Sequence, residues 1–202
     1  MARKTKEEAA RTRQRILDAA LDVFYKKGYL ATTIDDIATR IRLTKGAVYW
    51  HFDSKSDLIL ELVLLRVNRH LVLMQTSQAQ LRSLIGLRDF FVQRALHIVN
   101  TPNDRMFFSM MMRMDWNVEQ LKPVKHYLDT LDQNLISSLA NCLVQLKDMG
   151  VVRPNIDEKL IANVLGGLWI GLIKASIDGC LQDDLEKTIQ TGFDIILASC
   201  AH

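Results

Sequence analysis

The apolar residues of the chain recur three and four positions apart over most of its length, which is the spacing of amphipathic helices. In the first such stretch, Ile16, Ala20 and Phe24 share one helical face, and Gly28 follows as a terminator. The pattern predicts helices over residues 7–27, 34–42, 45–51, 54–78, 84–100, 104–115, 124–149, 157–177 and 183–199. Because alternation of β-branched residues is scarce, we expect an all-α fold of about nine helices.

Residues 32–58, TTIDDIATRIRLTKGAVYWHFDSKSDL, hold two short helical patterns joined by a brief turn. Thr33 is placed to cap the first helix, and the two acids that follow suit the positive end of its dipole. Thr44 is placed to cap the second helix, whose Val48 and Phe52 face inward. Two helices joined by a turn of three or four residues form the helix-turn-helix plan. The segment therefore predicts a module that reads DNA.

The second of these helices carries side chains suited to a nucleic-acid surface. Its outward groups are all hydrogen-bond donors able to reach phosphates or base edges, and they belong to Thr44, Lys45, Tyr49, Trp50 and His51. Gly46 has no side chain and lets the backbone approach a duplex closely. Lys55 is placed to add a phosphate contact from the flank. The alternative reading of the aromatic residues is core packing, which we expect for Phe52.

These residues resemble the N-terminal domain of the TetR family of transcriptional regulators, whose strongest marker has the form T-x-G-x-x-Y-x-H-F-x-x-K-x-x-L. The chain matches it from Thr44 to Leu58. The opening MARKTKEEAARTRQRILDAAL and the phrase GAVYWHFDSKSDL resemble the AcrR-like branch, whose members commonly repress multidrug efflux operons. One departure is the turn, where Ile41, Arg42 and Leu43 replace the Ala-Gly-Val type of turn frequent in relatives.

The resemblance implies a residue set for DNA binding. Its members are Thr33, Thr44, Lys45, Gly46, Ala47, Tyr49, Trp50, His51 and Lys55. In the family the tyrosine and histidine mostly hold phosphates, so Thr44, Lys45 and Ala47 are expected to read the bases. The resemblance also implies an N-terminal three-helix helix-turn-helix DNA-binding domain and a C-terminal helical ligand-binding and dimerisation domain. We place these at residues 1–55 and 56–202.

The charge distribution agrees with this division. Residues 1–55 hold 12 Lys and Arg against 7 Asp and Glu, whereas residues 56–202 hold 14 against 16. A basic segment before the first apolar stripe, with Arg3, Lys4 and Lys6 among its cations, is either a phosphate-binding arm or a solvated helix start. A double-stranded DNA operator is the partner that this charge favours.

The last two predicted helices are apolar most of the way round, as expected of helices packed between two partners. In the TetR family the two final helices form a four-helix dimer interface, which implies a homodimer. The expected interface residues are Val164, Leu168, Leu172, Ile189, Phe193 and Ile196. The alternative is packing within the monomer alone. The uncharged run 160–173 is too short for a bilayer of roughly 30 Å, so no membrane partner is expected.

A cluster rich in methionine and aromatic residues lies in the middle of the chain. Methionine is flexible and polarizable, so such a wall can refit around different lipophilic effectors, although the same residues also serve as ordinary core. The expected ligand-binding residues are Phe90, Phe91, His97, Met106, Phe107, Met110, Met111, Met114 and Trp116. We expect a lipophilic small molecule to favour a conformation with wrongly spaced reading helices and to release DNA.

Other chemistry has little support in the sequence. Cys142, Cys180 and Cys200 have no paired metal spacing, and the five histidines are scattered, so neither a metal nor a cofactor is expected. No signal peptide is visible, and reduced thiols suit the cytoplasm. The rival functions are regulation of a lipid or aromatic metabolic operon, an enzyme that uses His97 and Asp115 in the C-terminal cavity, and a DNA-binding scaffold without a ligand.

Overall fold

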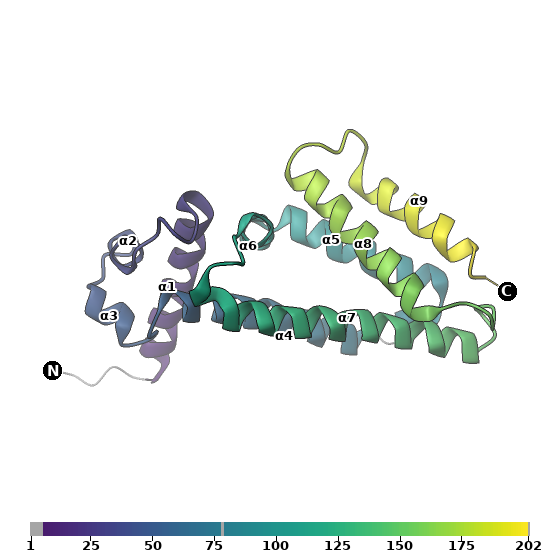
Figure 1. Ribbon diagram of the computed structural model, residues 1–202, viewed down its shortest axis with the longest axis horizontal. Helices are drawn as coiled ribbons and strands as arrows, with labels where there is room; N and C mark the ends of the chain where they lie inside the picture. Colours follow the sequence, from purple (N-terminus) through teal and green to yellow (C-terminus); the bar gives the residue numbers. More distant parts are fainter. Residues whose placement is uncertain (1–5, 78, 202) are drawn as a thin grey trace. The chain divides into compact units, whose positions relative to one another are not determined.

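The computed structural model describes residues 6–77 and 79–201, and its regular structure in these ranges is helical (Figure 1). The helices are α1 Lys6–Lys27, α2 Ile34–Arg40, α3 Lys45–Tyr49, α4 Lys55–Thr76, α5 Leu84–Asn100, α6 Pro102–Arg113, α7 Lys122–Asp148, α8 Glu158–Ile177 and α9 Leu185–Ala198. Two short 3₁₀ turns cover Gln80–Arg82 and Glu119–Leu121. The predicted all-α fold is confirmed, and α2 and α3 each end two residues before their predicted ends.

The chain divides into two compact units. The first comprises Met1–His70 and Met106–Lys125, and the second comprises Leu71–Arg105 and His126–His202. Helices α4, α6 and α7 each contribute residues to both units. The predicted boundary at residue 55 concerns function rather than packing, and it stays a prediction.

The core of the first unit is built on α1. Ile16, Leu17 and Phe24 of α1 are at most 1% exposed, because their spacing places them on the face against which α2 packs. Helix α3 packs on α2 through Val48, which is fully buried. The predicted core role of Phe52 is confirmed, since its side chain is 5% exposed. These contacts fix one face of α3 and leave the other face outward.

The turn between α2 and α3 is closed by a residue in the left-handed backbone region. Arg42 has φ 57°, the only positive φ of a non-glycine residue within residues 6–77 and 79–201. The amide of Leu43 donates to the carbonyl of Ala38 at 2.9 Å, and the amide of Arg42 donates to Thr39 at 3.2 Å. These two bonds form a Schellman motif, which usually has glycine at the position of Arg42. The turn of this chain therefore has the left-handed backbone conformation usual for glycine, although arginine occupies the position.

Replacing Arg42 with glycine should raise the free energy of unfolding by about 0.5–1 kcal/mol. A side chain in the left-handed region costs roughly 1–2 kcal/mol, and the greater chain entropy of unfolded glycine offsets part of the gain. Urea denaturation measures the difference. The control is Arg40→Gly in the last turn of α2, which should lower stability by about 1 kcal/mol or more, because its backbone is helical and its guanidinium pairs with Asp22 at 2.8 Å.

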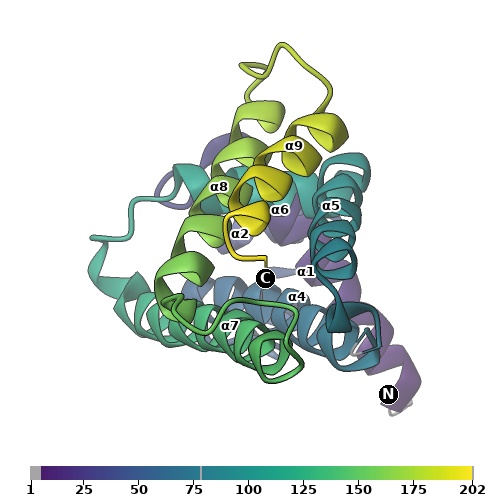
Figure 2. The same ribbon diagram turned by 90° about the vertical axis from the view of Figure 1, so that its right-hand side faces the viewer.

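The second unit contains α5, α8 and α9, which lie side by side (Figure 2). Phe91 of α5 is the centre of an aromatic cluster, with ring centroids 5.6 Å from Trp169 of α8 and 5.3 Å from Phe193 of α9. The indole N–H of Trp169 donates to the carbonyl of Phe91 at 2.8 Å. Because that bond satisfies the polar atom of a large side chain, the tryptophan can pack among apolar neighbours.

Within the chain, helix α8 is buried along one face only, so the predicted packing between two partners stays a prediction. Ala162, Leu165 and Ile173 are fully buried, while Leu160 is 58% exposed and Val164 is 46% exposed. An 18-residue window within this 20-residue helix has a mean hydropathy of 1.7, so by length and composition it is the one described helix that could cross a membrane. It is longer than the uncharged run, because the helix continues past the lysines at both ends.

Candidate nucleic-acid interface

Helix α2 is held by a capping box at its N-terminus. The hydroxyl oxygen of Thr33 accepts from the amide of Asp36 at 3.1 Å, and the amide of Thr33 donates to a carboxylate oxygen of Asp36 at 2.9 Å. Lys27 of α1 pairs with the same carboxylate at 2.6 Å. This hydrogen bond from Lys27 and the two from Thr33 lower the pKa of Asp36 from 3.8 to about 2. Asp36 thus joins the end of α1 to the start of α2.

Acid should weaken the first unit through Asp36. Since the pKa of Asp36 is lowered in the folded chain, its contribution to stability is present above pH 3.8 and is lost as the pH falls toward 2. Asp36→Asn should therefore make the melting temperature less dependent on pH in this window. Melting curves between pH 5 and 2 test this. The control is Asp53→Asn, which alters an exposed carboxylate of the same unit; an equal flattening there would contradict the assignment.

Helix α3 presents most of its polar side chains outward. Thr44 caps the helix by accepting from the amide of Ala47 at 3.2 Å, which leaves the hydroxyl hydrogen of Thr44 able to donate to a phosphate. Tyr49 is 45% exposed, and Trp50, just past the helix end, is 71% exposed. The rings of Trp50 and His51 meet edge to face, with centroids 4.5 Å apart. The arrangement gives a row of donors on one side of α3.

Gly46 lies on the exposed side of α3 with open space above it. A Cβ built at this position would meet no atom within 4 Å, so the glycine is not required by contacts within the chain. Ala47 and His51 are half-buried. Thr33 differs from Thr44, because its hydroxyl both donates to the carboxylate of Asp36 and accepts from the amide of Asp36.

Lys45 is held by an acid on the neighbouring helix. Its ammonium lies 3.1 Å from a carboxylate oxygen of Asp35, and this hydrogen bond raises the pKa of Lys45. The sequence relates Asp35 only to the dipole of α2 and does not predict its contact with Lys45. The two residues are ten positions apart, so no helical spacing relates them. The contact could have been predicted only from the way a helix-turn-helix places its two helices side by side.

Lys55 has partners inside the first unit. Its ammonium donates to the carbonyls of Tyr29 at 2.8 Å and Thr32 at 2.7 Å, and it lies 4.5 Å from the ring centroid of Tyr29. Burial lowers the pKa of Lys55. Two of its three N–H donors are therefore used to hold the α1–α2 loop, and the third is the one available to a phosphate.

The basic segment at the start of the chain divides into two parts. Arg3 and Lys4 lie outside the described residues, whereas Lys6 begins α1. Farther along α1, Arg13 pairs with Glu61 of α4 at 2.8 Å, and Arg15 donates to the carbonyl of Ile41 at 3.1 Å. These two arginines brace α1 against α4 and the α2–α3 turn. The arm itself stays a prediction.

Two capped helices with an outward row of donors are the geometry of a helix-turn-helix, and comparison with known proteins agrees. The family model for bacterial regulatory proteins, tetR family, matches residues 16–62. The probable HTH-type transcriptional regulator ArpR of Pseudomonas putida is 30% identical over 210 residues, covering 100% of this chain and 99% of ArpR. The chain belongs to the TetR family of bacterial regulatory proteins.

Further relatives of this TetR-family chain include efflux regulators. AcrR of Shigella flexneri is 53% identical over 62 residues, which are 31% of this chain and 29% of AcrR. SmeT, the repressor of the Stenotrophomonas maltophilia multidrug efflux pump SmeDEF, matches with a TM-score of 0.75 and 25% identity over 94% of this chain and 90% of that chain. A SmeT–triclosan complex matches with a TM-score of 0.78 and 27% identity, over 95% of this chain and 92% of that chain. The predicted AcrR-like character is confirmed, and the relatives are transcriptional regulators rather than enzymes.

The structure distributes the predicted ligand-binding residues of this TetR-family protein over both units. Phe90, Phe91 and His97 belong to the second unit, where both phenylalanines are buried and His97 pairs with Asp104 at 3.1 Å. The other six lie in the first unit: Met106, Phe107, Met110, Met111, Met114 and Trp116. Among these, Met110 and Met114 line a cavity together with the end of α1, while the guanidinium of Arg66 lies over the ring of Phe107. A single ligand pocket formed by all nine residues stays a prediction.

Two of the predicted dimer-interface residues are wrong. Ile189 and Phe193 are fully buried within the chain, so no partner surface can cover them further. Both fall on the face of α9 that packs into the second unit, and the sequence pattern alone did not separate that face from the outer one. Val164 is exposed, and Leu168, Leu172 and Ile196 are half-buried, so their role in an interface stays a prediction.

Within residues 6–77 and 79–201, no group of three or more His, Cys, Asp or Glu side chains is placed to hold a metal ion. The two residues of the rival catalytic pair fall in different units, His97 in the second and Asp115 in the first. The ring of His97 has Asp104 as its acidic partner instead.

Proposed function

We propose that this protein is a dimeric transcriptional repressor that binds a palindromic operator in the cytoplasm and is released by a lipophilic small molecule. The observation that supports it most directly is the outward row on α3, where Lys45, Tyr49 and Trp50 are exposed while Val48 anchors the helix from behind. Donors at the start of a recognition helix reach base edges, and flanking donors reach phosphates. The predicted contact residues fit these two roles.

The outer face of α8 supports a dimer. Leu160, Val164, Gly167 and Gly171 are spaced by four, three and four residues, and all four are exposed. A Cβ built at either glycine would meet no atom within 4 Å, so a second backbone can come close to this face. An interface along α8 also accounts for its apolar composition without a membrane. Two recognition helices related by a two-fold axis would then read half-sites about 34–36 Å apart.

Control of an efflux operon is the regulatory role that we propose for this dimer. It rests on the relatives, because SmeT represses an efflux pump and also forms a complex with triclosan. The effector acts by binding one conformation of the dimer better than the other, and the ratio of the two affinities sets how far operator binding falls. The alternative, a lipid or aromatic metabolic operon, predicts metabolic genes rather than a transporter beside the gene for this protein.

Fluorescence anisotropy on the DNA upstream of its own gene tests the proposal. We expect the full chain to bind a palindromic fragment far more tightly than random duplex of equal length, with triclosan as the first effector to be added. Constant operator affinity with an effector that is demonstrably bound, for instance by thermal shift, would reject release by ligand. Equal affinity for the palindrome and for random DNA at low salt would reject the repressor itself.

Asp35→Asn should raise affinity for random duplex several-fold while raising operator affinity less, so that specificity falls. The carboxylate holds Lys45 in one position and repels phosphates, and its removal frees a cation for contacts that do not depend on sequence. Anisotropy with both duplexes at one salt concentration measures the ratio. Asp18→Asn on α1 removes the same charge from an exposed residue and is the control. An equal change in both variants would contradict a role for the contact with Lys45.

A further inference from the structure

The first unit contains a cavity of about 410 Å³ beside the end of α1. One wall is formed by residues 24–31, which are the last turn of α1 and the loop that follows. The other wall comes from Met110, Arg113, Met114, Asp115 and Val118, at the end of α6 and just beyond it. Ligand pockets range from about 300 to 1,000 Å³, so this cavity fits a small ligand.

Much of the lining is apolar and adaptable. Phe24 and Met110 form its buried part, at 1% and 4% exposed. Tyr25, Met114 and Val118 are nearer the solvent. Methionine side chains can adjust to hydrocarbon of different shapes, so this wall suits an alkyl chain or an aryl ring rather than one fixed outline.

Arg113 is the cation of the cavity best placed to bind an anion. Its Nε donates to the carbonyl of Ser109 at 3.2 Å, and its guanidinium lies 4.9 Å from the ring centroid of Tyr25, so the group is held on two sides. Among the described residues, no acceptor is bonded to its two amino nitrogens. Such a guanidinium can bind a carboxylate through two parallel hydrogen bonds.

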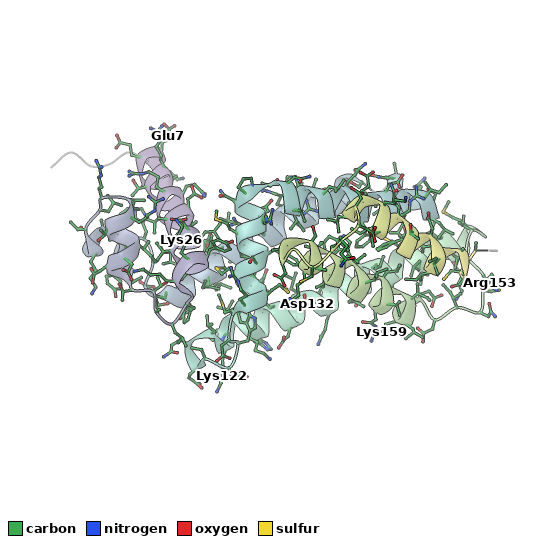
Figure 3. The ribbon with its side chains drawn as sticks, turned by 90° about the horizontal axis from the view of Figure 1, so that it is seen from above. Glu7, Lys26, Lys122, Asp132, Arg153 and Lys159 are labelled. Carbon is green, nitrogen blue, oxygen red and sulfur yellow. The ribbon has the colours of Figure 1, made fainter. Side chains whose placement is uncertain are left out.

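The other charges of the lining have partners within the chain. Lys26, which Figure 3 labels on the last turn of α1, pairs with Asp22 at 2.7 Å. Lys27 pairs with Asp36 at 2.6 Å. Asp115 is the one carboxylate among these residues, and it accepts from the amide of Asn117 at 3.0 Å. Because Asp22 and Asp36 neutralise the two lysines, Arg113 is the cation of the lining that has donors to offer a negatively charged ligand.

We infer that this cavity binds a small amphiphilic carboxylate, with the carboxylate on Arg113 and the hydrocarbon against Tyr25 and Met114. The inference goes beyond the proposed function, because it assigns an acidic ligand to a site in the first unit and does not depend on DNA binding. The ligand would contact the loop after α1, whose carbonyls Lys55 holds. This loop leads to the N-terminal cap of α2, so a bound ligand would lie close to the start of that helix.

Decanoate, used below its critical micelle concentration, is the probe for isothermal titration calorimetry with the full chain. Decanol and decyltrimethylammonium carry the same hydrocarbon without the negative charge, and both should bind more weakly. Arg113→Gln should weaken decanoate binding about tenfold, since one charged hydrogen bond is enough for a decade in affinity. Arg113→Lys keeps the positive charge, so it should bind decanoate more tightly than Arg113→Gln and more weakly than the unaltered chain. Arg153→Gln, on the loop after α7 (Figure 3), is the matched control and should bind as the unaltered chain does.

A diazirine-bearing decanoate then locates the site by photolabelling and mass spectrometry. We expect label within residues 24–31 or 110–118. Label confined to α5, α8 or α9, or wild-type affinity in Arg113→Gln, would overturn the inference. Equal binding of decanol and decanoate would overturn the assignment of an acidic ligand. Thermal melts establish that each variant is folded, and none of these results depends on whether the protein binds an operator.

Discussion

Replacing Val164 with glutamate should raise the dimer dissociation constant at least 100-fold. Val164 lies on the exposed face of α8 and is 46% exposed, so the isolated chain can hold a charge there at little cost. In a symmetric interface the same residue occurs twice, and a buried charge without a partner costs about 3–5 kcal/mol. Each factor of ten corresponds to about 1.4 kcal/mol, so the expected shift exceeds two decades. Sedimentation equilibrium at micromolar concentrations measures it.

The matched control for this change is Ile85→Glu. Ile85 lies on α5 in the same unit and is 64% exposed. Its replacement by glutamate should leave the dimer intact. Loss of dimerisation in Ile85→Glu but not in Val164→Glu would place the interface elsewhere and contradict the proposed face. A monomeric Val164→Glu protein should also lose operator affinity, because each monomer can reach only one half-site.

The sequence predicted the helices well because helical spacing is a local property. α5 was predicted at its observed bounds, and α1 and α8 to within one residue, since glycine and capping residues mark their ends directly. The left-handed backbone at Arg42 was not predicted, because arginine carries no local signal for it. The Schellman motif that ends α2 requires that conformation. The packing of α2 and α3 decides the direction in which the chain leaves the motif.

The burial of the last two helices shows a different limit. Apolar residues occur on more than one face of α8 and α9, and periodicity cannot tell which face meets its own chain and which meets another. Phe193 was therefore assigned to an interface, although it packs against Phe91 in the interior. Exposure separates the two faces, and it moves the proposed interface toward Leu160 and Val164.

The DNA contacts were predicted from residue type. Residue type does not reveal whether a side chain already has a partner within the chain. Tyr49 and Trp50 are exposed as a reading surface needs. Lys45 and Lys55 have the same chemistry in the sequence, yet one pairs with an exposed carboxylate and the other with two carbonyls. That difference depends on how the α1–α2 loop folds back over the start of α4, which no short motif encodes.

Lys55→Met should lower the free energy of unfolding by about 1–3 kcal/mol. The carbonyls that its ammonium holds belong to Tyr29 and Thr32, which are 8% and 1% exposed. The carbonyl of Tyr29 keeps a bond from the amide of Thr32 at 3.3 Å, so the carbonyl of Thr32 is the one left without a donor. A buried acceptor left without a donor costs about 1–3 kcal/mol, and methionine keeps the hydrocarbon stem while removing the donor. Urea denaturation at pH 7 gives the change. Lys45→Met is the matched control, because an exposed ion pair contributes little to stability.

The same two variants should give the opposite order in DNA binding. Lys45→Met should weaken operator binding about tenfold or more, since a residue at the front of the recognition helix reaches base edges. Lys55→Met, measured where it is fully folded, should retain most of its affinity. The contrary result is a stable Lys55→Met protein whose salt slope of log K falls by about 0.9, the value for one phosphate contact. In that case Lys55 binds the DNA backbone, and its bonds to the loop contribute little to stability.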